Sequence, residues 1–423
     1  MRRPRRPASP PARTVEVVIS SLGAQGDGVA EYNGQPLYVP LSLSGERMRV
    51  RTGAKRGEGL EAEIVEILEA SPERVAPPCP YFGTCGGCQL QHLRPEAYRA
   101  WKWGLLADTL KRGGLEGVEL EPLAVVPDRS RRRAAFAVKG QAVGFHQRRS
   151  HGVVEIADCL LLRPEITALL APFSALLREV RGVSGIVATL TEAGVDVLLT
   201  GSGSPDLAQR ECLVAFAERV DLARLSWQGD VLEPIAARRP PVITFGGVAV
   251  EPPPGAFLQP SREGEAFLRD AVLAGVGKAT SIADLYCGLG SFTFPLAEGG
   301  RKVVGMEGAV ELIAALKAAA DKARLPHVRA LVRDLTQRPL LAPDLTGFDA
   351  VVFDPPRAGA KVQVEAFAQA GAPPTLVAVS CNPATFLRDS RTLTDAGWRC
   401  TALTPVDQFP YSSHLEVVGV FHR

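Results

Sequence analysis

Several features that mark whole classes of protein are missing from this sequence. No stretch approaches the ~18 uninterrupted apolar residues of a membrane-spanning helix, so none is expected. Residues 1–13 contain no apolar segment of the kind found in a secretory signal, and their five arginines and several prolines favour a flexible basic arm. These absences predict a cytoplasmic protein with no membrane partner.

A strong excess of charge of one sign is also missing. The 48 Lys and Arg against 46 Asp and Glu leave a net charge of +2, which by itself says nothing about a nucleic-acid partner. The distribution is less even, since residues 129–149 include seven Lys or Arg and no acid. Such a run is usually a solvated surface, but together with the basic arm it makes a polyanionic partner a second interpretation.

The 8 cysteines are unevenly spaced and follow no signal segment, which favours reduced thiols, a metal site or catalysis over a disulfide scaffold. Cys79, Cys85 and Cys88 lie in a stretch rich in proline and glycine, with C-x5-C-x2-C spacing that indicates a centre held by thiolates, either iron–sulfur or zinc, which the spacing alone does not separate. Cys159 is the nearest downstream candidate for a fourth ligand. Zinc is the alternative, although zinc sites more often use two C-x2-C pairs. A radical S-adenosylmethionine cluster usually has C-x3-C-x2-C spacing, which is not present.

The N-terminal half has the patterns of two small domains. Residues 14–70 predict five short strands with glycine corners and a hairpin turn at Asn33-Gly34. They indicate an OB-like β-barrel, a shape often used for single-stranded nucleic acid. Residues 71–250 predict a central α+β domain that carries the three-cysteine stretch. We expect a helix over residues 91–118, packed on the C-terminal domain.

Residues 251–423 predict a parallel α/β domain with a cofactor site. A strand at 281–285 leads into a glycine-rich loop, and the next three strands are followed by acidic residues, Glu307, Asp334 and Asp354. The carboxyl ends of such strands form one crevice, where Glu307 would accept hydrogen bonds from ribose hydroxyls and Asp334 would reach an adenine amine. The loop lacks the third glycine that packs a pyrophosphate, which favours S-adenosylmethionine over a nicotinamide cofactor. A helix cap or surface charge is the alternative for each acid.

One cysteine is the candidate nucleophile. An apolar strand over 375–379 predicts that Cys381 lies at its carboxyl end, before the turn formed by Asn382-Pro383, where a thiol would face the crevice. A buried structural cysteine is the alternative. Glu416 begins an apolar strand over 417–421 and is either an edge charge or a catalytic base.

Taken together, these motifs resemble the RNA uridine C5-methyltransferase family, in the branch that carries a TRAM domain and a [4Fe–4S] cluster. The most specific stretches are residues 380–385 (SCNPAT), 354–357 (DPPR) and 284–290 (DLYCGLG), together with the three-cysteine stretch. The resemblance extends over nearly the whole chain. It implies an α/β protein with a Rossmann-like class I methyltransferase domain at 251–423, a TRAM barrel at 14–70 and an iron–sulfur domain between them.

The resemblance also implies roles for single residues. The nucleophile falls on Cys381 and the proton-abstracting base on Glu416. The cluster ligands fall on Cys79, Cys85, Cys88 and Cys159. The S-adenosylmethionine contacts fall on Gln259, Tyr286, Ser291, Glu307, Asp334 and Asp354. Two positions depart from the family pattern: Ser261 stands where Asn is frequent, and Ser291 stands where Asn or Thr is frequent.

The implied reaction transfers a methyl group from S-adenosylmethionine to C5 of a uridine in RNA. Attack of a Cys381 thiolate on C6 would make C5 nucleophilic, and Glu416 would later remove the C5 proton. We expect a monomer that acts on ribosomal RNA, with transfer RNA as the alternative substrate. A TRAM-containing radical methylthiotransferase and a non-catalytic RNA-binding protein are the competing interpretations, and neither explains Cys381 together with Glu416.

Overall fold

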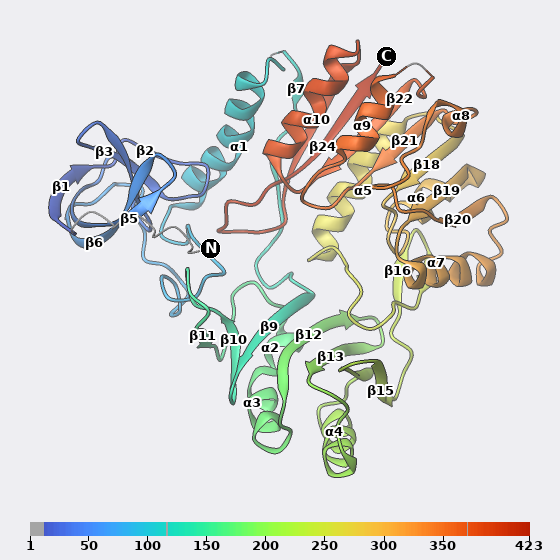
Figure 1. The fold of residues 1–423 in the computed structure, drawn as a ribbon, viewed down its shortest axis with the longest axis horizontal. Helices are drawn as coiled ribbons and strands as arrows, with labels where there is room; N and C mark the ends of the chain where they lie inside the picture. The colour runs from blue at the N-terminus through green and yellow to red at the C-terminus, as the bar shows by residue number, and fades with distance from the viewer. Residues whose placement is uncertain (1–11, 116, 370) are drawn as a thin grey trace, which may run out of the picture. The chain divides into compact units, whose positions relative to one another are not determined.

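The computed structural model describes residues 12–115, 117–369 and 371–423. The predicted basic arm therefore lies outside the described residues, apart from its last two positions. The described chain, coloured by residue number in Figure 1, divides into two compact units. The first comprises the residues up to Leu105 with Gln147–Ser150 and Tyr411–Ser413, and the second comprises Leu106–His146, His151–Pro410 and His414–Arg423.

The first unit is built on a six-stranded sheet in the order β1-β5-β6-β4-β3-β2. Its strands are β1 (Thr14–Val18), β2 (Ser21–Leu22), β3 (Gly28–Tyr32), β4 (Gln35–Val39), β5 (Arg47–Arg56) and β6 (Gly59–Glu69). The predicted hairpin joins β3 to β4, because Asn33 and Gly34 adopt the positive φ angles, 52° and 74°, that a type I′ turn requires. Inward-facing Leu37, Val39 and Met48 contribute to the core of the sheet.

The helix α1 (Pro95–Arg112) lies within the region where the sequence predicts a helix over 91–118. It begins later than predicted because Leu93 N–H donates to Leu90 O at 3.2 Å in a turn, and the following proline is favoured as a first helical residue. In the part that belongs to the second unit, Leu106 and Leu110 lie in the same core cluster as Phe386.

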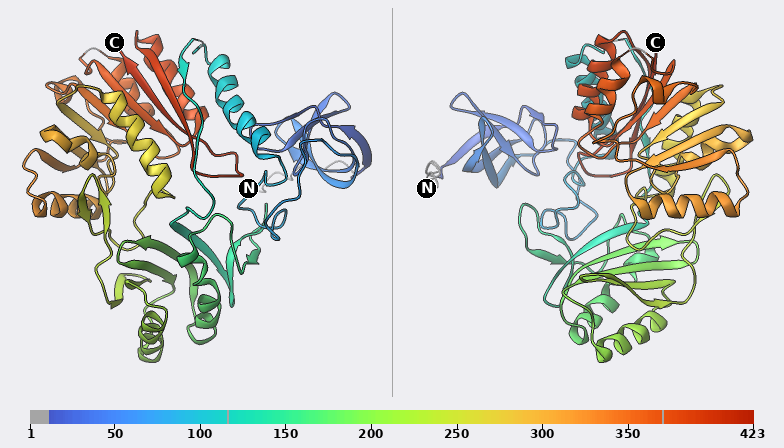
Figure 2. Two further views of the ribbon diagram at one scale, coloured as in Figure 1. Left: turned by 180° about the vertical axis from the view of Figure 1, so that it is seen from behind. Right: turned by 45° about the vertical axis from the view of Figure 1, so that its right-hand side comes forward.

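The second unit contains a seven-stranded sheet, β11-β10-β9-β12-β13-β14-β15, in which β13 and β14 are the parallel pair. Its strands are β9 (Arg133–Lys139), β10 (Ala142–His146), β11 (Val153–Glu155), β12 (Val183–Thr191), β13 (Gly194–Gly201), β14 (Arg224–Gln228) and β15 (Leu232–Ala237). Helices α2 (Pro164–Thr167), α3 (Leu170–Glu179) and α4 (Leu207–Arg219) accompany it, and Figure 2 shows α3 and α4 on one face. Phe173 of α3 joins them to the sheet, since its ring centroid lies 6.2 Å from that of Phe136 and 5.9 Å from that of Phe216.

The largest sheet of the second unit has the order β20-β19-β18-β21-β22-β24-β23-β7, with β8 beside β23. Its strands are β7 (Glu119–Leu120), β8 (Ala124–Val125), β18 (Ser281–Leu285), β19 (Lys302–Glu307), β20 (Val328–Val332), β21 (Ala350–Phe353), β22 (Thr375–Ser380), β23 (Arg399–Asp407) and β24 (Glu416–His422). The strands β18 to β22 run parallel, whereas β24 runs antiparallel to both of its neighbours. The parallel α/β domain predicted from the sequence is therefore confirmed.

Helices cover both faces of this sheet. The helices are α5 (Arg262–Val276), α6 (Thr293–Ala297), the short 3₁₀ helix η1 (Glu298–Gly300), α7 (Val310–Lys322), α8 (Ala342–Leu345), α9 (Lys361–Ala368) and α10 (Pro383–Asp395). A separate hairpin is formed by β16 (Ile243–Phe245) and β17 (Val248–Val250). Leu268 of α5 and Leu316 of α7 belong to one core cluster, whereas Phe367 of α9 and Phe386 of α10 belong to the other. The sheet is thus buried on both sides, as its continuous apolar strands require.

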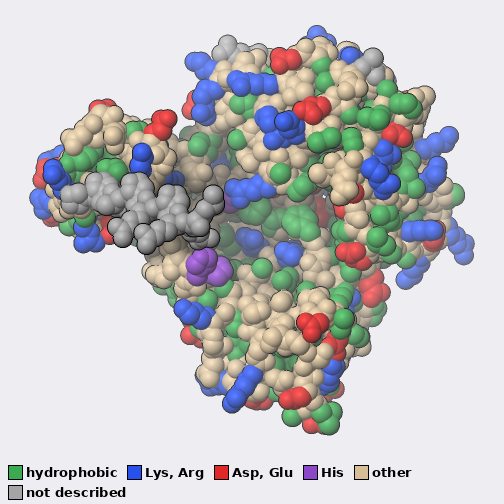
Figure 3. Space-filling view, viewed as in Figure 1, with side chains coloured by type: hydrophobic (Ala, Val, Ile, Leu, Met, Phe, Trp, Pro, Cys, Tyr) green, Lys and Arg blue, Asp and Glu red, His purple; other side chains and the backbone are tan. Residues whose placement is uncertain are grey.

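Several arginines of the basic run at 129–149 are paired with acids from other parts of the chain. Arg129 pairs with Asp158 at 2.9 Å, and the buried Arg132 pairs with Glu265 at 2.6 Å. On the face of the second unit seen in Figure 3, Lys and Arg side chains are interspersed with Asp and Glu. In the described part of the chain, no helix has both the length and the apolar composition to cross a membrane.

Ser261 caps α5, and this predicts a measurable loss of stability for Ser261→Ala. The buried Ser261 Oγ accepts a hydrogen bond from Gly264 N–H at 3.0 Å. Its removal should lower the free energy of unfolding by about 1 kcal/mol, measured by urea denaturation. Arg262→Ala, at an exposed position whose ion pair with Glu192 is 3.7 Å long, is the control and should change it by less than about 0.5 kcal/mol.

Candidate active site

The second unit contains a cavity of about 610 Å³ at the carboxyl ends of its parallel strands. Its lining includes every residue that the sequence assigned to the cofactor or to catalysis, namely Gln259, Tyr286, Ser291, Glu307, Asp334, Asp354, Cys381 and Glu416. These residues are far apart in the sequence and come from the ends of neighbouring strands and from the loops that follow them (Figure 1). The structure therefore brings the predicted cofactor and catalytic sets together in one place.

The loop between β18 and α6 is held by two carboxylates. Glu307 at the end of β19 accepts hydrogen bonds from Gly308 N–H at 2.7 Å and Ala309 N–H at 3.1 Å through one oxygen, and from Gly288 N–H at 3.4 Å through the other. Asp284 is buried below the loop, where Thr293 Oγ1 donates to it at 2.5 Å. Burial raises the pKa of Asp284 to about 7, and the charges of Asp354 and Glu307 add to the effect.

Asp334 and Asp354 lie at the ends of the next strands and have different surroundings. Asp334 Oδ1 accepts hydrogen bonds from Thr336 N–H at 2.9 Å and Gln337 N–H at 3.2 Å, so it fixes the turn after β20. Asp354 follows β21, and its burial raises the pKa of the carboxyl group to about 7. Gln259 Nε2 donates to Asp354 Oδ2 at a long 3.5 Å, which leaves room for another partner.

Cys381 and Glu416 lie at the ends of two paired strands. Cys381 directly follows β22, Glu416 begins β24, and the antiparallel register pairs Ser380 with Val417. The next step along this register sets Cys381 opposite Glu416. Desolvation raises the pKa of the Cys381 thiol to about 11, and the charges of Glu416 and Asp354 contribute, whereas Arg357 opposes them. The thiol is therefore protonated at neutral pH unless a positive charge is added beside it.

Arg357 is a cavity residue to which the sequence analysis gave no role. Its backbone oxygen accepts hydrogen bonds from Asn382 Nδ2 at 3.4 Å and Thr385 Oγ1 at 3.5 Å, which joins the loop after β21 to the start of α10. It lines the cavity, and its charge lowers the pKa of the Cys381 thiol. The sequence contained a sign of this role, because Arg357 lies within the DPPR stretch that carries the family resemblance. Only the fold, however, brings Arg357 close to the Cys381 thiol.

Comparisons with known proteins agree with this arrangement. A model of the tRNA (Uracil-5-)-methyltransferase family matches residues 250–423. An uncharacterized RNA methyltransferase of Brucella suis biovar 1 is 42% identical over 425 residues, which cover 97% of this chain and 99% of the relative. The 23S rRNA (uracil(1939)-C(5))-methyltransferase RlmD of Alkalilimnicola ehrlichii is 34% identical over 434 residues, which cover 98% of this chain and 97% of the relative.

The chain belongs to the RNA (uracil-C5)-methyltransferase family. The crystal structure of the Pyrococcus abyssi tRNA (uracil-54, C5)-methyltransferase in complex with S-adenosyl-L-homocysteine matches it with a TM-score of 0.76 and 22% identity over 96% of this chain and 99% of that chain. At this identity the likeness shows the fold, which is that of a Rossmann-like S-adenosylmethionine-dependent methyltransferase. The predicted enzyme class and the predicted methyltransferase fold are confirmed.

In this family member, the three-cysteine stretch lies in the first unit and Cys159 lies in the second. Cys85 N–H donates to Tyr81 O at 2.9 Å, and Gly87 N–H approaches Cys85 Sγ at 3.5 Å. Among the described residues, no three His, Cys, Asp or Glu side chains come together in the geometry of a metal site. Within the first unit, the three thiols are suitable donors on a turn-rich segment.

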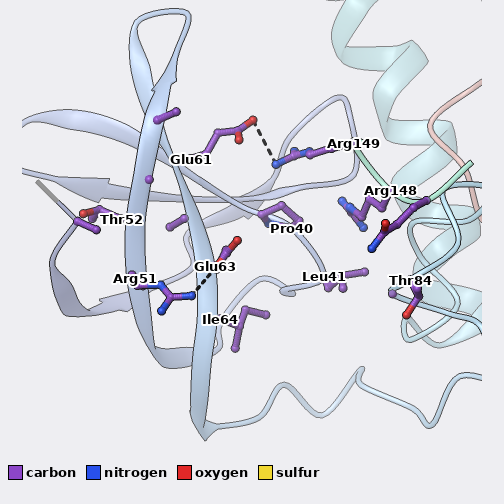
Figure 4. A pocket seen from close by; sticks show the side chains of 16 residues that line it. Pro40, Leu41, Arg51, Thr52, Glu61, Glu63, Ile64, Thr84, Arg148 and Arg149 are labelled. Carbon is purple, nitrogen blue, oxygen red and sulfur yellow. Dashed lines mark hydrogen bonds and ion pairs between the residues drawn. The ribbon is translucent and has the colours of Figure 1, made fainter. Parts of the chain in front are cut away.

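The first unit of this family member has a pocket of about 750 Å³ between its sheet and residues 147–149, drawn in Figure 4. Asp27 is buried beside it and pairs with Arg56 at 2.5 Å and with Arg148 and Arg149 at 3.0 Å each. Arg51 in the pocket lining pairs with Glu63 at 2.8 Å. The sequence analysis did not identify Asp27, because its partners lie up to 122 residues away.

The raised pKa of Cys381 predicts how its reactivity responds to a neighbouring charge. Glu416→Gln should increase the rate of iodoacetamide alkylation of Cys381 several-fold at about pH 8, because removing the adjacent negative charge lowers the pKa of the thiol. Peptide mass spectrometry would follow position 381 separately from the other cysteines. Asp334→Asn, an acid of the same cavity that does not contribute to the shift, is the control. An unchanged rate for Glu416→Gln would contradict the electrostatic coupling.

Proposed function

We propose that this enzyme methylates C5 of a specific uridine in 23S ribosomal RNA, through a covalent bond between Cys381 and C6 of the base. The observation that carries the proposal is the meeting of Cys381, Glu416 and the strand-end acids around one cavity. The ribosomal substrate is supported by the 34% identical relative, which is named as a 23S rRNA methyltransferase. Transfer RNA is the second candidate, because the matching family model carries that substrate in its description.

The chain's own residues supply the covalent and proton-transfer steps. The Cys381 thiolate adds to C6 of uracil, the C5–C6 double bond opens, and the electron pair makes C5 nucleophilic. When bound, S-adenosylmethionine supplies an electrophilic methyl group on a positively charged sulfonium. After C5 has been methylated, Glu416 removes the C5 proton, the double bond re-forms, and the sulfur of Cys381 leaves as thiolate.

The cavity is suited to a cationic cofactor. Burial raises the pKa values of Asp284 and Asp354 to about 7 and the pKa of the Cys381 thiol to about 11, and neighbouring carboxylates add to the shifts of Asp284 and Cys381. A positive group would favour the ionised forms of all three. We assign the ribose hydroxyls to Glu307 and the adenine amine to Asp334, and the remaining contacts to Gln259, Tyr286, Ser291 and Asp354.

We propose that Phe257 receives the target base after it leaves the RNA stack. Phe257 lines the cavity, yet its side chain is 65% exposed, which is unusual for a phenylalanine. The Arg133 guanidinium lies 5.9 Å from its ring centroid, where it would meet a base or a phosphate. An aromatic face beside a cation is a common support for an unstacked base.

We also propose that the first unit is a TRAM-type barrel that contacts RNA, and that Cys79, Cys85, Cys88 and Cys159 hold a [4Fe–4S] cluster. The curved sheet at 14–69 and the arginine-lined pocket support the first proposal. The thiol donors and the amide N–H directed at Cys85 Sγ support the second. No reaction step requires the cluster, so its role would be structural or would help to position the RNA.

Transfer of labelled methyl groups to RNA tests the function. The wild-type enzyme should label ribosomal RNA from a strain lacking this gene, and Cys381→Ala should abolish transfer while it still binds S-adenosylhomocysteine. Glu416→Gln should accumulate a protein–RNA adduct that survives a denaturing gel, because addition proceeds and elimination stalls. Cys381→Ala is the matched control and should form no adduct. Methylation by Cys381→Ala would refute the covalent route, and labelling of transfer RNA alone would refute the ribosomal substrate.

Purification without oxygen tests the cluster. We expect a brown protein with broad absorption in the blue and about four iron atoms per chain. Cys85→Ser should lose the colour, whereas Cys212→Ser, on α4 and outside the proposed ligand set, should keep it. A colourless, zinc-loaded protein would exclude the iron–sulfur assignment.

A further inference from the structure

Gln408 is a buried side chain that contacts the active site indirectly. It follows β23, has 3% of its surface exposed and does not line the cavity. Its Nε2 donates to Gln259 Oε1 at 2.9 Å, across 149 residues of sequence. Gln259 is buried as well and does line the cavity, so Gln408 is connected to the reaction site through one side chain.

We propose that Gln408 is a positioning residue for the transfer reaction, and that it holds Gln259 so that the amide N–H group of Gln259 faces the cavity. This proposal rests on the proposed function. A glutamine side chain can present either a carbonyl oxygen or an NH₂ group, and a half-turn exchanges the two. Because Gln408 donates to the carbonyl oxygen of Gln259, the NH₂ group is left to point at Asp354 Oδ2, 3.5 Å away.

The backbone of Gln259 is held from a different direction. Arg132 Nε donates to Gln259 O at 3.2 Å, and Arg132 N–H donates to Pro260 O at 2.7 Å. Arg132 is itself fixed by its ion pair with Glu265 at 2.6 Å. These bonds restrain the main chain of Gln259 but leave its side-chain amide free to rotate. The hydrogen bond from Gln408 Nε2 then fixes the orientation of that amide.

Gln408 is in turn held by the first turn of α5. Its side chain packs against Gly264, where a Cβ atom would overlap Gln408 Oε1 and lie 2.7 Å from its Cγ. Gln408 Oε1 has no hydrogen-bond partner among the described residues. Burying this unsatisfied oxygen costs free energy that a methionine of similar length would avoid. The Nε2 end of this buried amide, in contrast, donates the hydrogen bond to Gln259.

The orientation has a chemical consequence for the ligand. A cavity-facing N–H group recognises a hydrogen-bond-accepting oxygen and rejects a donor at the same point. Two sources of such an oxygen belong to the reaction: the carboxylate of the cofactor and a carbonyl oxygen of uracil. The long hydrogen bond to Asp354 leaves the N–H group available to either one.

A double-mutant cycle with Gln408→Met and Gln259→Met tests the proposal. Gln408→Met should weaken one ligand interaction about tenfold, the size expected for one lost hydrogen bond. Calorimetry with S-adenosylhomocysteine reports the loss if the oxygen belongs to the cofactor, and the KM for RNA reports it if the oxygen belongs to uracil. The double variant should be no worse than Gln259→Met alone, because Gln408 acts only through Gln259. Gln408→Glu should weaken the same ligand interaction more than Gln408→Met does. An ionised carboxylate only accepts hydrogen bonds, so it would favour the rotated amide of Gln259, with the NH₂ group toward position 408 and the carbonyl oxygen toward the cavity.

Gln363→Met is the control for the loss of a buried amide as such. Gln363 does not line the cavity; its Oε1 accepts a hydrogen bond from Leu340 N–H at 2.8 Å, and its Nε2 donates one to Leu340 O at 3.1 Å. Its replacement should therefore lower the thermal midpoint of unfolding without changing either ligand interaction. Additive losses in the cycle, or unchanged ligand parameters in Gln408→Met, would overturn the proposal. Failure of the proposed function would look different: the wild-type enzyme would transfer no methyl group to RNA, while the binding cycle would still report on Gln408.

Discussion

The antiparallel pairing of β22 with β24 is the constraint on which the candidate active site depends. In a parallel sheet, every neighbouring strand brings its own carboxyl end to the crevice. A single reversed strand instead brings residues from its amino end to the same edge. Because Ser380 pairs with Val417, the thiol that follows β22 and the carboxylate that begins β24 are set opposite one another. One register of one strand pair thus brings together the proposed nucleophile and the proposed base.

The cavity is also shaped by the negative charge that it concentrates. Carboxylates follow three successive parallel strands, and a fourth lies buried beneath the glycine-rich loop. Burial raises the pKa values of Asp284, of Asp354 and of the Cys381 thiol, and the charges of Glu416 and Asp354 add to the shift of the thiol. Such a site resists further negative charge and favours a cation. The field therefore favours binding of a sulfonium, whose positive charge would in turn lower the pKa of the thiol.

The amide pair at Gln259 and Gln408 adds a different kind of control. Electrostatic attraction can draw a cation into the cavity, but it distinguishes poorly between groups that differ only in hydrogen-bonding direction. Under our proposal, Gln259 makes that distinction, because the hydrogen bond from Gln408 fixes which end of its amide faces the cavity. The long 3.5 Å hydrogen bond to Asp354 suggests a polar group held ready for a ligand rather than used up by the protein.

The sequence by itself determined the order of strands and acids in the second unit, the glycine-rich loop and the cysteine that ends β22. These features depend on local patterns: apolar strands, turn-forming residues and charges at strand ends. Only the tertiary structure decided that arginines of the basic run at 129–149 pair with acids elsewhere in the chain, that Asp27 binds three arginines and that Gln408 donates a hydrogen bond to Gln259. Each of these involves residues separated by long stretches of chain, so hydrophobic periodicity carries no information about them.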